Sequence, residues 1–394
     1  MTFNFRNQPL KGIYVMYAVL SVIFVRLPWW TLVSLISRPR ASWTLKRAIL
    51  VRLIRYFTGI NDRIFTLQAC PDHRAITGGK GVKGVWVEPV PNFVTGQVKE
   101  WADQANVRPV RIPGYWQDKK GYHFSVGQKP TADEKVLYLL HGGGYIALSA
   151  HPADITSNIA RGILKCSSDI KRSFAIEYRL SSSAPLPVAN PFPAALIDAL
   201  AGYNYLVNVV GYSPSQIVIA GDSAGGNLAL ALTRYLVDNP IPSLPLPSGI
   251  LLLSPWCDLG PSHLKPGSSV YSFANSDFLV PPNRKGMSGW SITSFVGVLS
   301  SAAAKTNIYI SPASQDVASG GYEAFPPSFI VAGGAEIFYD QIVTLRKRMQ
   351  ADMGSEKVRY YEAKDGVHDY LILPWHEPER GQTLRAIAEW ISEL

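Results

Sequence analysis

Residues 216–226 read QIVIAGDSAGG, and this stretch decides the fold. The apolar run at residues 216–220 predicts a buried strand, and residues 225–237 predict a helix. Ser223 stands between them in a Gly-x-Ser-x-Gly pattern, which is typical of a tight strand-to-helix turn that exposes a serine hydroxyl. The helix N-terminus faces this hydroxyl and favours negative charge beside it. The five-residue pattern alone is common, but its flanking strand and helix make Ser223 a candidate nucleophile.

Short aliphatic runs alternate with helix-like stretches around this turn. The expected strands are residues 136–140, 173–178, 216–220, 249–253, 328–332 and 358–361, and the expected helices are 193–207, 225–237, 340–353 and 382–394. This alternation indicates an α/β fold with a mostly parallel central sheet and helices on both faces. In such sheets the chemistry gathers at the carboxyl ends of the strands, where Ser223 is expected.

A glycine-rich loop, residues 141–145 (HGGGY), follows the first of these strands. Consecutive glycines leave backbone N–H groups free to point at a ligand oxygen. The N–H groups of Gly143, Gly144 and Ala224 therefore form a candidate oxyanion hole. A flexible turn or a phosphate loop would also be glycine-rich, but the Gly-Lys-Ser/Thr of a phosphate loop is missing. We interpret His141 as a structural residue that holds the loop.

A serine nucleophile requires a base, and three of the seven histidines follow Ser223 in the chain. The order that goes with this strand–turn–helix motif is serine, acid, histidine. His368 comes just after the strand at residues 358–361 and is the expected base. His376 is expected at the surface before the last helix, and His263 precedes every candidate acid.

Together these motifs resemble the hormone-sensitive-lipase-like branch of the α/β-hydrolases. The resemblance is carried by HGGG at 141–144, YRL at 178–180, PFPAAL at 191–196, GDSAGG at 221–226, and SPW at 254–256 with Asp258. It runs from about Val136 to the C-terminus. It implies an α/β-hydrolase fold with an N-terminal helical cap, and a serine esterase activity. Within the branch, the apolar and basic N-terminus is similar to fungal steryl acetyl hydrolases and arylacetamide deacetylases, which are membrane-associated.

The resemblance also locates the acid of the triad. The family usually carries an Asp, then two or three residues, then a second Asp; here residues 333–340 read GGAEIFYD. Matching the motif residue by residue puts the acid at Glu336, and Glu serves as the orienting acid in some triads of this fold. Asp340 is the alternative, and its other expected role is to cap the helix at 340–353.

The implied reaction is acyl transfer through an acyl-enzyme, without a metal ion or an organic cofactor. Tyr145, Asp222 and Trp256 adjoin the motifs and are expected to contact the substrate. Residues 259–300 are rich in Pro, Ser, Gly and aromatic residues and are expected to form a cap insertion. Because an aromatic pocket favours an apolar ligand, we expect an acetyl or other short ester of a hydrophobic alcohol, such as a sterol or terpenoid.

Two other functions use the same fold. A non-catalytic receptor for a small molecule would lack the base, so the presence of Ser223, Glu336 and His368 together argues against it. An acyltransferase or an amidase would carry the same three residues and stays open at this point.

The net charge of +9 is concentrated at the N-terminus. Residues 1–61 contain nine of the 38 Lys and Arg residues and no Asp or Glu. A local basic excess indicates a contact near one end of the chain. Nucleic acid is not an expected partner, because no nucleic-acid-binding motif is present and the basic residues stand among Trp and aliphatic residues.

An apolar run at residues 12–25 is interrupted by Arg26 and Pro28 and then continues to Ser37. Both parts together reach the roughly 20 residues that a membrane-spanning helix needs. Residues 41–57 predict a basic amphipathic helix with Ser42 as its N-cap, suited to an anionic membrane surface. We therefore expect residues 1–60 to form a membrane-associating or cap segment ahead of a catalytic domain at 61–394. The expected location is a membrane, that of the endoplasmic reticulum, with the cytoplasm as the alternative.

Overall fold

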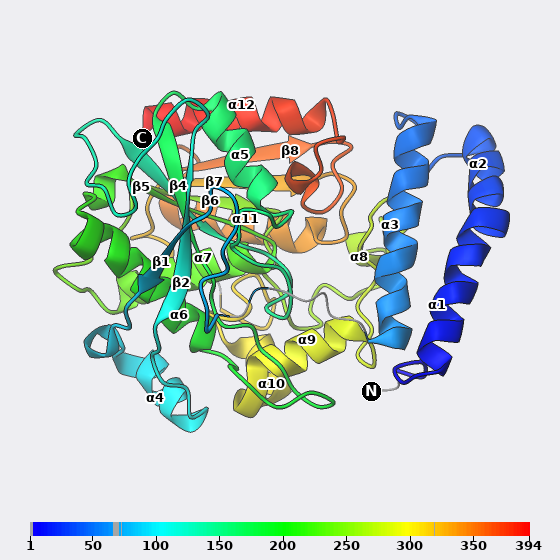
Figure 1. Cartoon of the computed structure of the whole chain (residues 1–394), viewed down its shortest axis with the longest axis horizontal. Coiled ribbons are helices and arrows are strands. Elements are labelled where there is room, and N and C mark those ends of the chain that lie inside the picture. Colours follow the sequence, from blue (N-terminus) through cyan, green and yellow to red (C-terminus); the bar gives the residue numbers. More distant parts are fainter. Residues whose placement is uncertain (1–2, 66–70, 72, 319) are drawn as a thin grey trace.

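A computed structural model describes residues 3–65, 71, 73–318 and 320–394 of the chain. An eight-stranded sheet forms its centre, in the order β1-β2-β4-β3-β5-β6-β7-β8 (Figure 1). The strands are β1 (Lys83–Val87), β2 (Ile112–Asp118), β3 (Lys135–Leu140), β4 (Ile170–Ile176), β5 (Ile217–Asp222), β6 (Gly249–Leu253), β7 (Ser328–Gly333) and β8 (Val358–Ala363). The strands from β4 to β8 in this order are parallel, whereas β2 runs antiparallel to both β1 and β4.

The expected α/β-hydrolase architecture is confirmed, and all six strands expected from the sequence are present. The first two strands were missed. β1 is only partly buried, and β2 contains Pro113 and Gly114, two residues that normally argue against a strand. Pro113 is tolerated because its carbonyl can still accept a hydrogen bond, which comes from the N–H of Glu177.

Both faces of the sheet are buried, because alternate strand residues enter two separate cores. On one face Leu137, Leu139, Val218 and other strand residues pack against α5 (Ser157–Cys166) and α12 (Glu379–Glu393). The other face packs against three further helices, which are α6 (Ala194–Asn204), α7 (Ala224–Asp238) and α11 (Tyr339–Met353). Buried parallel sheets of this kind are expected to read as continuous apolar runs.

The direction in which successive strands are added to the sheet reverses between β3 and β5, although the strands themselves are parallel. The connection after β3 leads to β4 on one side, and β5 then pairs on the other side of β3. The loop after β3 leads to α5 on one face of the sheet and the loop after β5 leads to α7 on the other face, and such a switch point is where α/β sheets bind their ligands. Both sequence motifs, the glycine-rich loop and the turn at Ser223, begin at this point.

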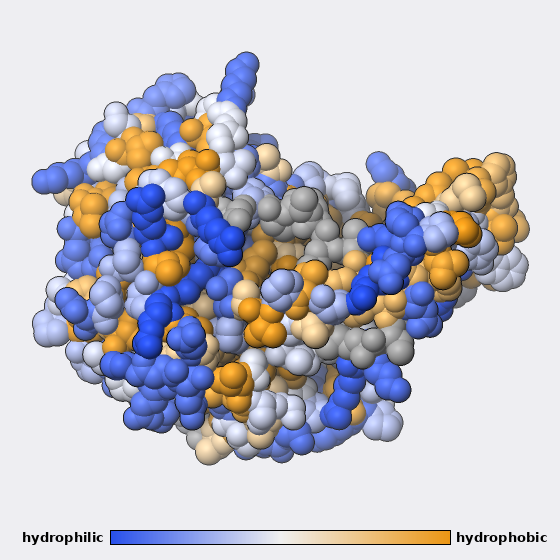
Figure 2. All heavy atoms as spheres, turned by 60° about the horizontal axis from the view of Figure 1, so that its bottom comes forward, coloured by the Kyte–Doolittle hydropathy of each residue, from blue (hydrophilic) through white to orange (hydrophobic). Residues whose placement is uncertain are grey.

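The N-terminal part forms a helical hairpin that projects from the body (Figure 1). One long helix comprises α1 (Leu10–Ser21), a π-helical turn (Val22–Arg26) and α2 (Leu27–Ile36), and α3 (Leu45–Ile64) returns along it. The π turn directly precedes Pro28, whose missing N–H would break a regular helix. Many apolar side chains are exposed on this projection (Figure 2).

The predicted N-cap of α3 was wrong by two residues. The helix begins at Leu45, and the Thr44 side chain accepts a hydrogen bond from the Arg47 N–H. Thr44 has extended backbone angles that aim its hydroxyl at the helix, whereas Ser42 lies in the exposed turn before the fully buried Trp43.

The segment expected to be a cap insertion contains α8 (Ser269–Ser272), α9 (Met287–Val296) and the start of α10 (Ser300–Thr306). α4 (Gly96–Gln104) lies far from the N-terminal hairpin (Figure 1), and its Trp101 packs against Phe192 and Tyr309. In α9 the fully buried Trp290 packs against Phe3 and Phe65 of the N-terminal part and against Ile146, which follows the glycine-rich loop. The N-terminal part and α9 thus pack together beside this loop.

Candidate active site

Ser223 occupies a strained turn between β5 and α7. Its backbone angles are φ 50° and ψ −116°, a combination that a residue with a side chain rarely adopts. The turn is possible because its glycines approach other backbone atoms closely. A Cβ on Gly225 would lie 2.0 Å from the carbonyl oxygen of Leu140, and one on Gly221 would lie 2.1 Å from that of Gly225. The motif therefore holds a serine hydroxyl at the carboxyl edge of the sheet.

Three side chains from three loops form a hydrogen-bonded row at this edge. The Oγ of Ser223 lies 3.0 Å from Nε2 of His368, and Nδ1 of His368 lies 2.8 Å from Oε2 of Glu336. Ser223 follows β5, His368 follows β8, and Glu336 follows β7. Glu336 is fully buried and also accepts hydrogen bonds from the N–H of Gly333 and the hydroxyl of Ser254.

Asp340, the alternative acid, has a different partner. Its Oδ2 accepts a hydrogen bond from the N–H of Ser269 at 2.7 Å, and it lies in the first turn of α11. Asp340 therefore ties α8 to α11. Of the two carboxylates, Glu336 is the one in the row with His368.

Burial and neighbouring charges set the protonation of this row. Burial raises the pKa of Glu336 to about 7, and the hydrogen bond with His368 opposes that rise. Burial disfavours a charged His368, but the carboxylates of Asp369 and Glu336 outweigh it and hold the pKa of this imidazole well above its ordinary value. Together these carboxylates favour an imidazolium at the centre of the row.

Asp369 is one of two residues of the site that could not be identified from the sequence. Its Oδ2 lies 3.1 Å from Nε2 of His368, the same nitrogen that faces Ser223. Asp369 adopts a left-handed backbone conformation, with φ 46°, and its N–H donates to Ser254. One signal was present in the sequence, a carboxylate directly after the expected base. Adjacent residues usually point apart, and only the left-handed turn brings this carboxylate back to the imidazole.

Asp277 is a second missed residue, and it supports His368 from the cap segment. It is fully buried, and its carboxylate accepts hydrogen bonds from the N–H groups of His368 and Ile337. It thus joins the loop of the base to the loop of Glu336. Burial raises the pKa of Asp277.

The glycine-rich loop lies beside the serine. A Cβ on Gly142 would lie 3.2 Å from the Cβ of Ser223, and Gly143 and Gly144 have φ values of 101° and 61°. A Cβ on Gly143 would collide with the carbonyl of Ala147 at 2.1 Å. The backbone at Gly143 is accessible only to glycine, and the loop lies where its amides are candidates for an oxyanion site.

His141 anchors this loop through contacts with Tyr178. Its ring stacks on Tyr178 with centroids 4.2 Å apart, and the Tyr178 hydroxyl donates to the His141 carbonyl. Burial lowers the pKa of His141 to about 4, so the ring is neutral at pH 7.

The three residues expected to contact substrate differ in their surroundings. The hydroxyl of Tyr145 donates to Asn227 and its ring stacks on Phe295, so it anchors the loop from the interior. Asp222 is buried against Gly142, and burial together with Asp369 raises its pKa well above its ordinary value. Trp256 stacks on Phe338, whose ring lies edge-on to His368, and its own backbone N–H donates to the Ser223 carbonyl, so Trp256 also borders the row.

The prediction that His376 lies at the surface was wrong. His376 is fully buried between Tyr370 and Trp375, with Nδ1 3.4 Å from Glu379 at the start of α12. Arg47 of α3 forms an ion pair with this same glutamate. His263 pairs with Asp258 at 2.6 Å. Within the described ranges, no group of three or more His, Cys, Asp or Glu residues is placed to hold a metal ion.

Comparisons with known proteins agree with this arrangement. A family model described as the alpha/beta hydrolase fold matches residues 136–372. An esterase of Acinetobacter venetianus is 26% identical over 291 residues, which are 73% of this chain and 82% of that protein. An acetyl-hydrolase of Streptomyces hygroscopicus is 37% identical over 134 residues, which are 33% of this chain and 40% of that protein.

Solved structures give the same result. A hormone-sensitive lipase from a metagenome library superposes with a TM-score of 0.54 at 28% identity, covering 71% of this chain and 80% of that one. A thermostable esterase from Pseudomonas putida superposes with a TM-score of 0.58 at 18% identity, covering 79% and 82%. The second likeness shows the fold alone.

The position of Asp369 predicts a shift in the pH profile of the enzyme. A general base must be neutral, so activity is lost as the pH falls through the pKa of His368. Asp369→Asn removes a carboxylate that raises this pKa, so the acidic limb of kcat/KM should move to lower pH, by about one unit. The measurement is kcat/KM for a soluble ester across the pH range. Asp365→Asn, on the same loop, is the control and should leave the limb in place. An unmoved limb in Asp369→Asn would show that this carboxylate does not hold the imidazolium.

Proposed function

The chain belongs to the alpha/beta hydrolase fold family, and we propose that it is a serine esterase of the hormone-sensitive-lipase-like branch that uses Ser223, His368 and Glu336. The observation that carries the proposal is the row from Ser223 through His368 to Glu336, with distances of 3.0 and 2.8 Å. Relatives named esterase and acetyl-hydrolase support ester hydrolysis. A hydroxyl with a base in hydrogen-bond reach, and a third group that orients the base, is the arrangement that nucleophilic catalysis needs.

In the proposed mechanism, Nε2 of His368 takes the proton of Ser223 as Oγ attacks the ester carbonyl. The negative oxygen of the tetrahedral intermediate accepts hydrogen bonds from the N–H groups of Gly143, Gly144 and Ala224. His368 then gives the proton to the leaving alkoxide, and the alcohol departs. A water molecule, deprotonated by His368, attacks the acyl-enzyme and releases the acid and the free serine.

Glu336 is proposed to hold His368 in the tautomer with its proton on Nδ1 and to stabilise the imidazolium. Its two further hydrogen bonds, from Gly333 and Ser254, fix its carboxylate. The contact between Asp369 and Nε2 gives the imidazolium a second anionic neighbour on the side of the substrate.

The proposed substrate is a short acyl ester, acetyl in particular, of a hydrophobic alcohol such as a sterol or terpenoid. Rings from Phe278 and Phe338 approach the His368 ring within 6.0 and 4.9 Å. A Cβ on Gly144 would lie 3.9 Å from the Trp256 ring, so an indole stands next to the proposed oxyanion loop. This apolar surrounding favours an apolar ligand.

The N-terminal part is proposed to contact a membrane, that of the endoplasmic reticulum, with a cytoplasmic location as the alternative. Leu10–Ile36 is long and apolar enough to cross a membrane, by its length and composition. Its exposed apolar side chains support such a contact, since large apolar patches on a protein surface mark interaction sites. Apolar esters also concentrate in membranes.

The role of Ser223 predicts covalent labelling by a fluorophosphonate probe. Ser223→Ala should abolish labelling and lower kcat for 4-nitrophenyl acetate by about 10⁴-fold or more. Ser301→Ala, at an exposed serine of α10, should label and react as the parent does. A parent protein that neither labels nor hydrolyses the ester would instead support a non-catalytic receptor.

The two acidic residues near α11 predict opposite results. Glu336→Gln removes the charge beside Nδ1 and should lower kcat by about 10³–10⁴-fold, with little change in unfolding temperature. Asp340→Asn loses only the link to Ser269 and should keep most of the activity. A large loss in Asp340→Asn with full activity in Glu336→Gln would reverse the assignment.

The substrate proposal predicts a preference for short acyl groups. Among 4-nitrophenyl esters, kcat/KM should be highest for acetate or butyrate and about tenfold or more lower for palmitate, by the usual sensitivity of apolar pockets to chain length. Parallel assays with an added alcohol and with an anilide test acyl transfer and amide hydrolysis. Products dominated by transfer to the alcohol, or faster cleavage of the anilide, would contradict an esterase.

A further inference from the structure

The long N-terminal helix carries its apolar side chains on the outside. The exposed ones include Ile13, Met16, Leu20, Phe24, Leu32 and Ile36, which follow a helical spacing along its outer face. The inner face meets α3 with Ala18 and Val22 buried, and Ala18 packs with Ile60 and Ile64. This order is the reverse of a helix on a water-soluble protein, and it suits an outer face that meets lipid.

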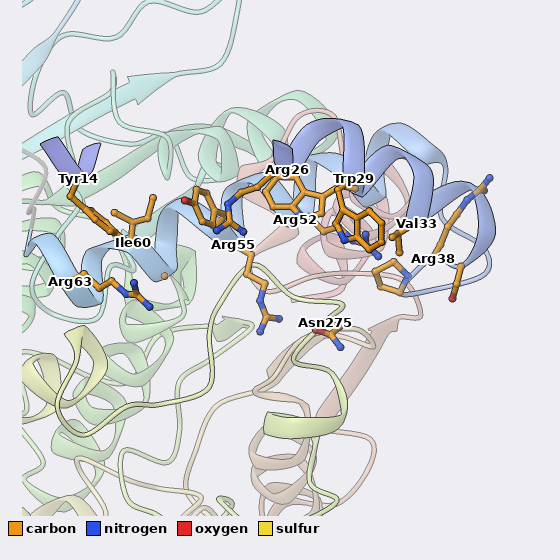
Figure 3. A pocket seen from close by; sticks show the side chains of 15 residues that line it. Tyr14, Arg26, Trp29, Val33, Arg38, Arg52, Arg55, Ile60, Arg63 and Asn275 are labelled. Carbon is orange, nitrogen blue, oxygen red and sulfur yellow. The ribbon is translucent and has the colours of Figure 1, made fainter. Parts of the chain in front are cut away.

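A cavity of about 660 Å³ lies between this helix and α3, and we call it the arginine cavity. Figure 3 shows its walls, with the long helix and α3 on either side of the lining side chains and the loop of Asn275 below them. Its charged lining consists of Arg26, Arg38, Arg52, Arg55 and Arg63. Aromatic rings of Tyr14, Trp29, Trp30 and Tyr56 stand among them, and none of the described residues that line the cavity is Asp or Glu.

The positive charge of the arginine cavity is not neutralised. None of the five arginines forms an ion pair within the described part of the chain. Two are partly engaged: the Arg26 guanidinium donates to Ser21 and stacks over Tyr56, and Arg38 donates to the carbonyls of Ser34 and Trp43. Arg63 lies only over the ring of Tyr14. Several guanidinium groups around one cavity repel one another unless an anion binds there.

Arg55 gives the clearest sign of a missing ligand. Its Nη1 is buried and makes no hydrogen bond in the described structure. In Figure 3 its side chain extends away from α3 into the space toward the loop of Asn275. Burial lowers the pKa of Arg55 and of the neighbouring Arg52, and the more distant Asp277 partly offsets this for Arg55. A buried donor without a partner is costly, and a bound oxyanion would satisfy it.

The surroundings favour a lipid headgroup as that anion. The wall of the cavity is the helix whose other face is apolar, so a ligand with an anionic head and apolar chains fits both sides. Arginine forks match phosphate oxygens in pairs, and Trp and Arg side chains are common at the level of lipid headgroups.

The arginine cavity also lies close to the proposed active site along the chain. Asn275 lines the cavity, and two residues later Asp277 accepts the N–H of His368. Phe278 then lies with its ring 6.0 Å from that of His368. A headgroup bound in the cavity would therefore hold the catalytic loops near the membrane surface, where an apolar ester collects.

We propose that the arginine cavity binds the phosphate of an acidic glycerophospholipid headgroup while the outer face of Leu10–Ile36 enters the acyl-chain region. The inference rests on the proposed membrane contact and adds a ligand class and a binding site to it.

The test is flotation of the full-length protein with three kinds of vesicle: phosphatidylcholine alone, phosphatidylcholine with phosphatidic acid, and phosphatidylcholine with a fatty acid at equal surface charge. The parent should bind the phosphatidic acid vesicles most tightly. Arg52→Gln/Arg55→Gln/Arg63→Gln should lose this preference, with binding to those vesicles about tenfold or more weaker, since each basic residue near an anionic surface contributes roughly fivefold.

A matched control removes the same charge elsewhere in the N-terminal part. Arg6→Gln/Lys11→Gln/Lys46→Gln changes three basic residues that do not line the cavity, and it should keep the preference for phosphatidic acid over the fatty acid. The preference should also persist in high salt, because partly buried charges are screened less than exposed ones. Hydrolysis of 4-nitrophenyl acetate in solution shows that each variant is folded.

Four outcomes would overturn the inference. Equal losses in the two triple variants would mean diffuse attraction instead of a site. Release of the protein from phosphatidic acid vesicles when inorganic phosphate is added to the flotation buffer would mean a site for a free anion. Binding to all vesicles without headgroup preference would leave the membrane contact standing and remove the cavity's role, whereas no binding to any vesicle would remove both.

Discussion

The parallel pairing of β3 with β5 is the constraint on which the proposed site depends. In this register Leu140 lies opposite Gly221, so the glycine-rich loop and the serine turn leave the sheet side by side. The glycines at 221 and 225 permit the close approach, because a Cβ at either would overlap a backbone carbonyl. The strain in Ser223 is held by buried strands on either side, which is how an unfavourable backbone conformation persists in a folded protein.

The loops after β7 and β8 are joined by backbone hydrogen bonds, from Gly334 to Ala363 and from Ala335 to Gly366, and also by buried polar side chains. Ser254 donates to Glu336 and accepts from Asp369, and Asp277 accepts the N–H groups of Ile337 and His368. These bonds hold Glu336 and His368 in register with Ser223. The cost of burying so many carboxylates is offset only while every partner stays in place, so the network keeps the site in one arrangement.

Local sequence signals account for most of what could be predicted. The turn at Ser223 and the loop at residues 141–145 are short motifs flanked by strongly apolar strands, so both the fold and the row with His368 follow from them. Asp277 and Asp369 could not be found this way. Asp277 reaches the base only through the folding of a long insertion, and Asp369 only through a left-handed residue. His376 was misjudged because a polar residue near a helix start is usually exposed, whereas here the rings of Tyr370 and Trp375 pack against it.

The same limit applies to the N-terminal part. The apolar run was evident from the sequence, but which of its side chains face α3 and which face outward was not. A regular α-helix has 3.6 residues per turn. The π turn at Val22–Arg26 is wider, so it rotates the side chains that follow it to another face of the helix. Only the packing against α3 shows that Arg26 points inward together with Arg52 and Arg55. An exposed apolar face next to a cavity lined by arginines without anionic partners is unfavourable in water. A partner that is both apolar and anionic would remove both costs. The exposed apolar side chains of the helix and the arginines of the cavity therefore both favour contact with an anionic lipid surface.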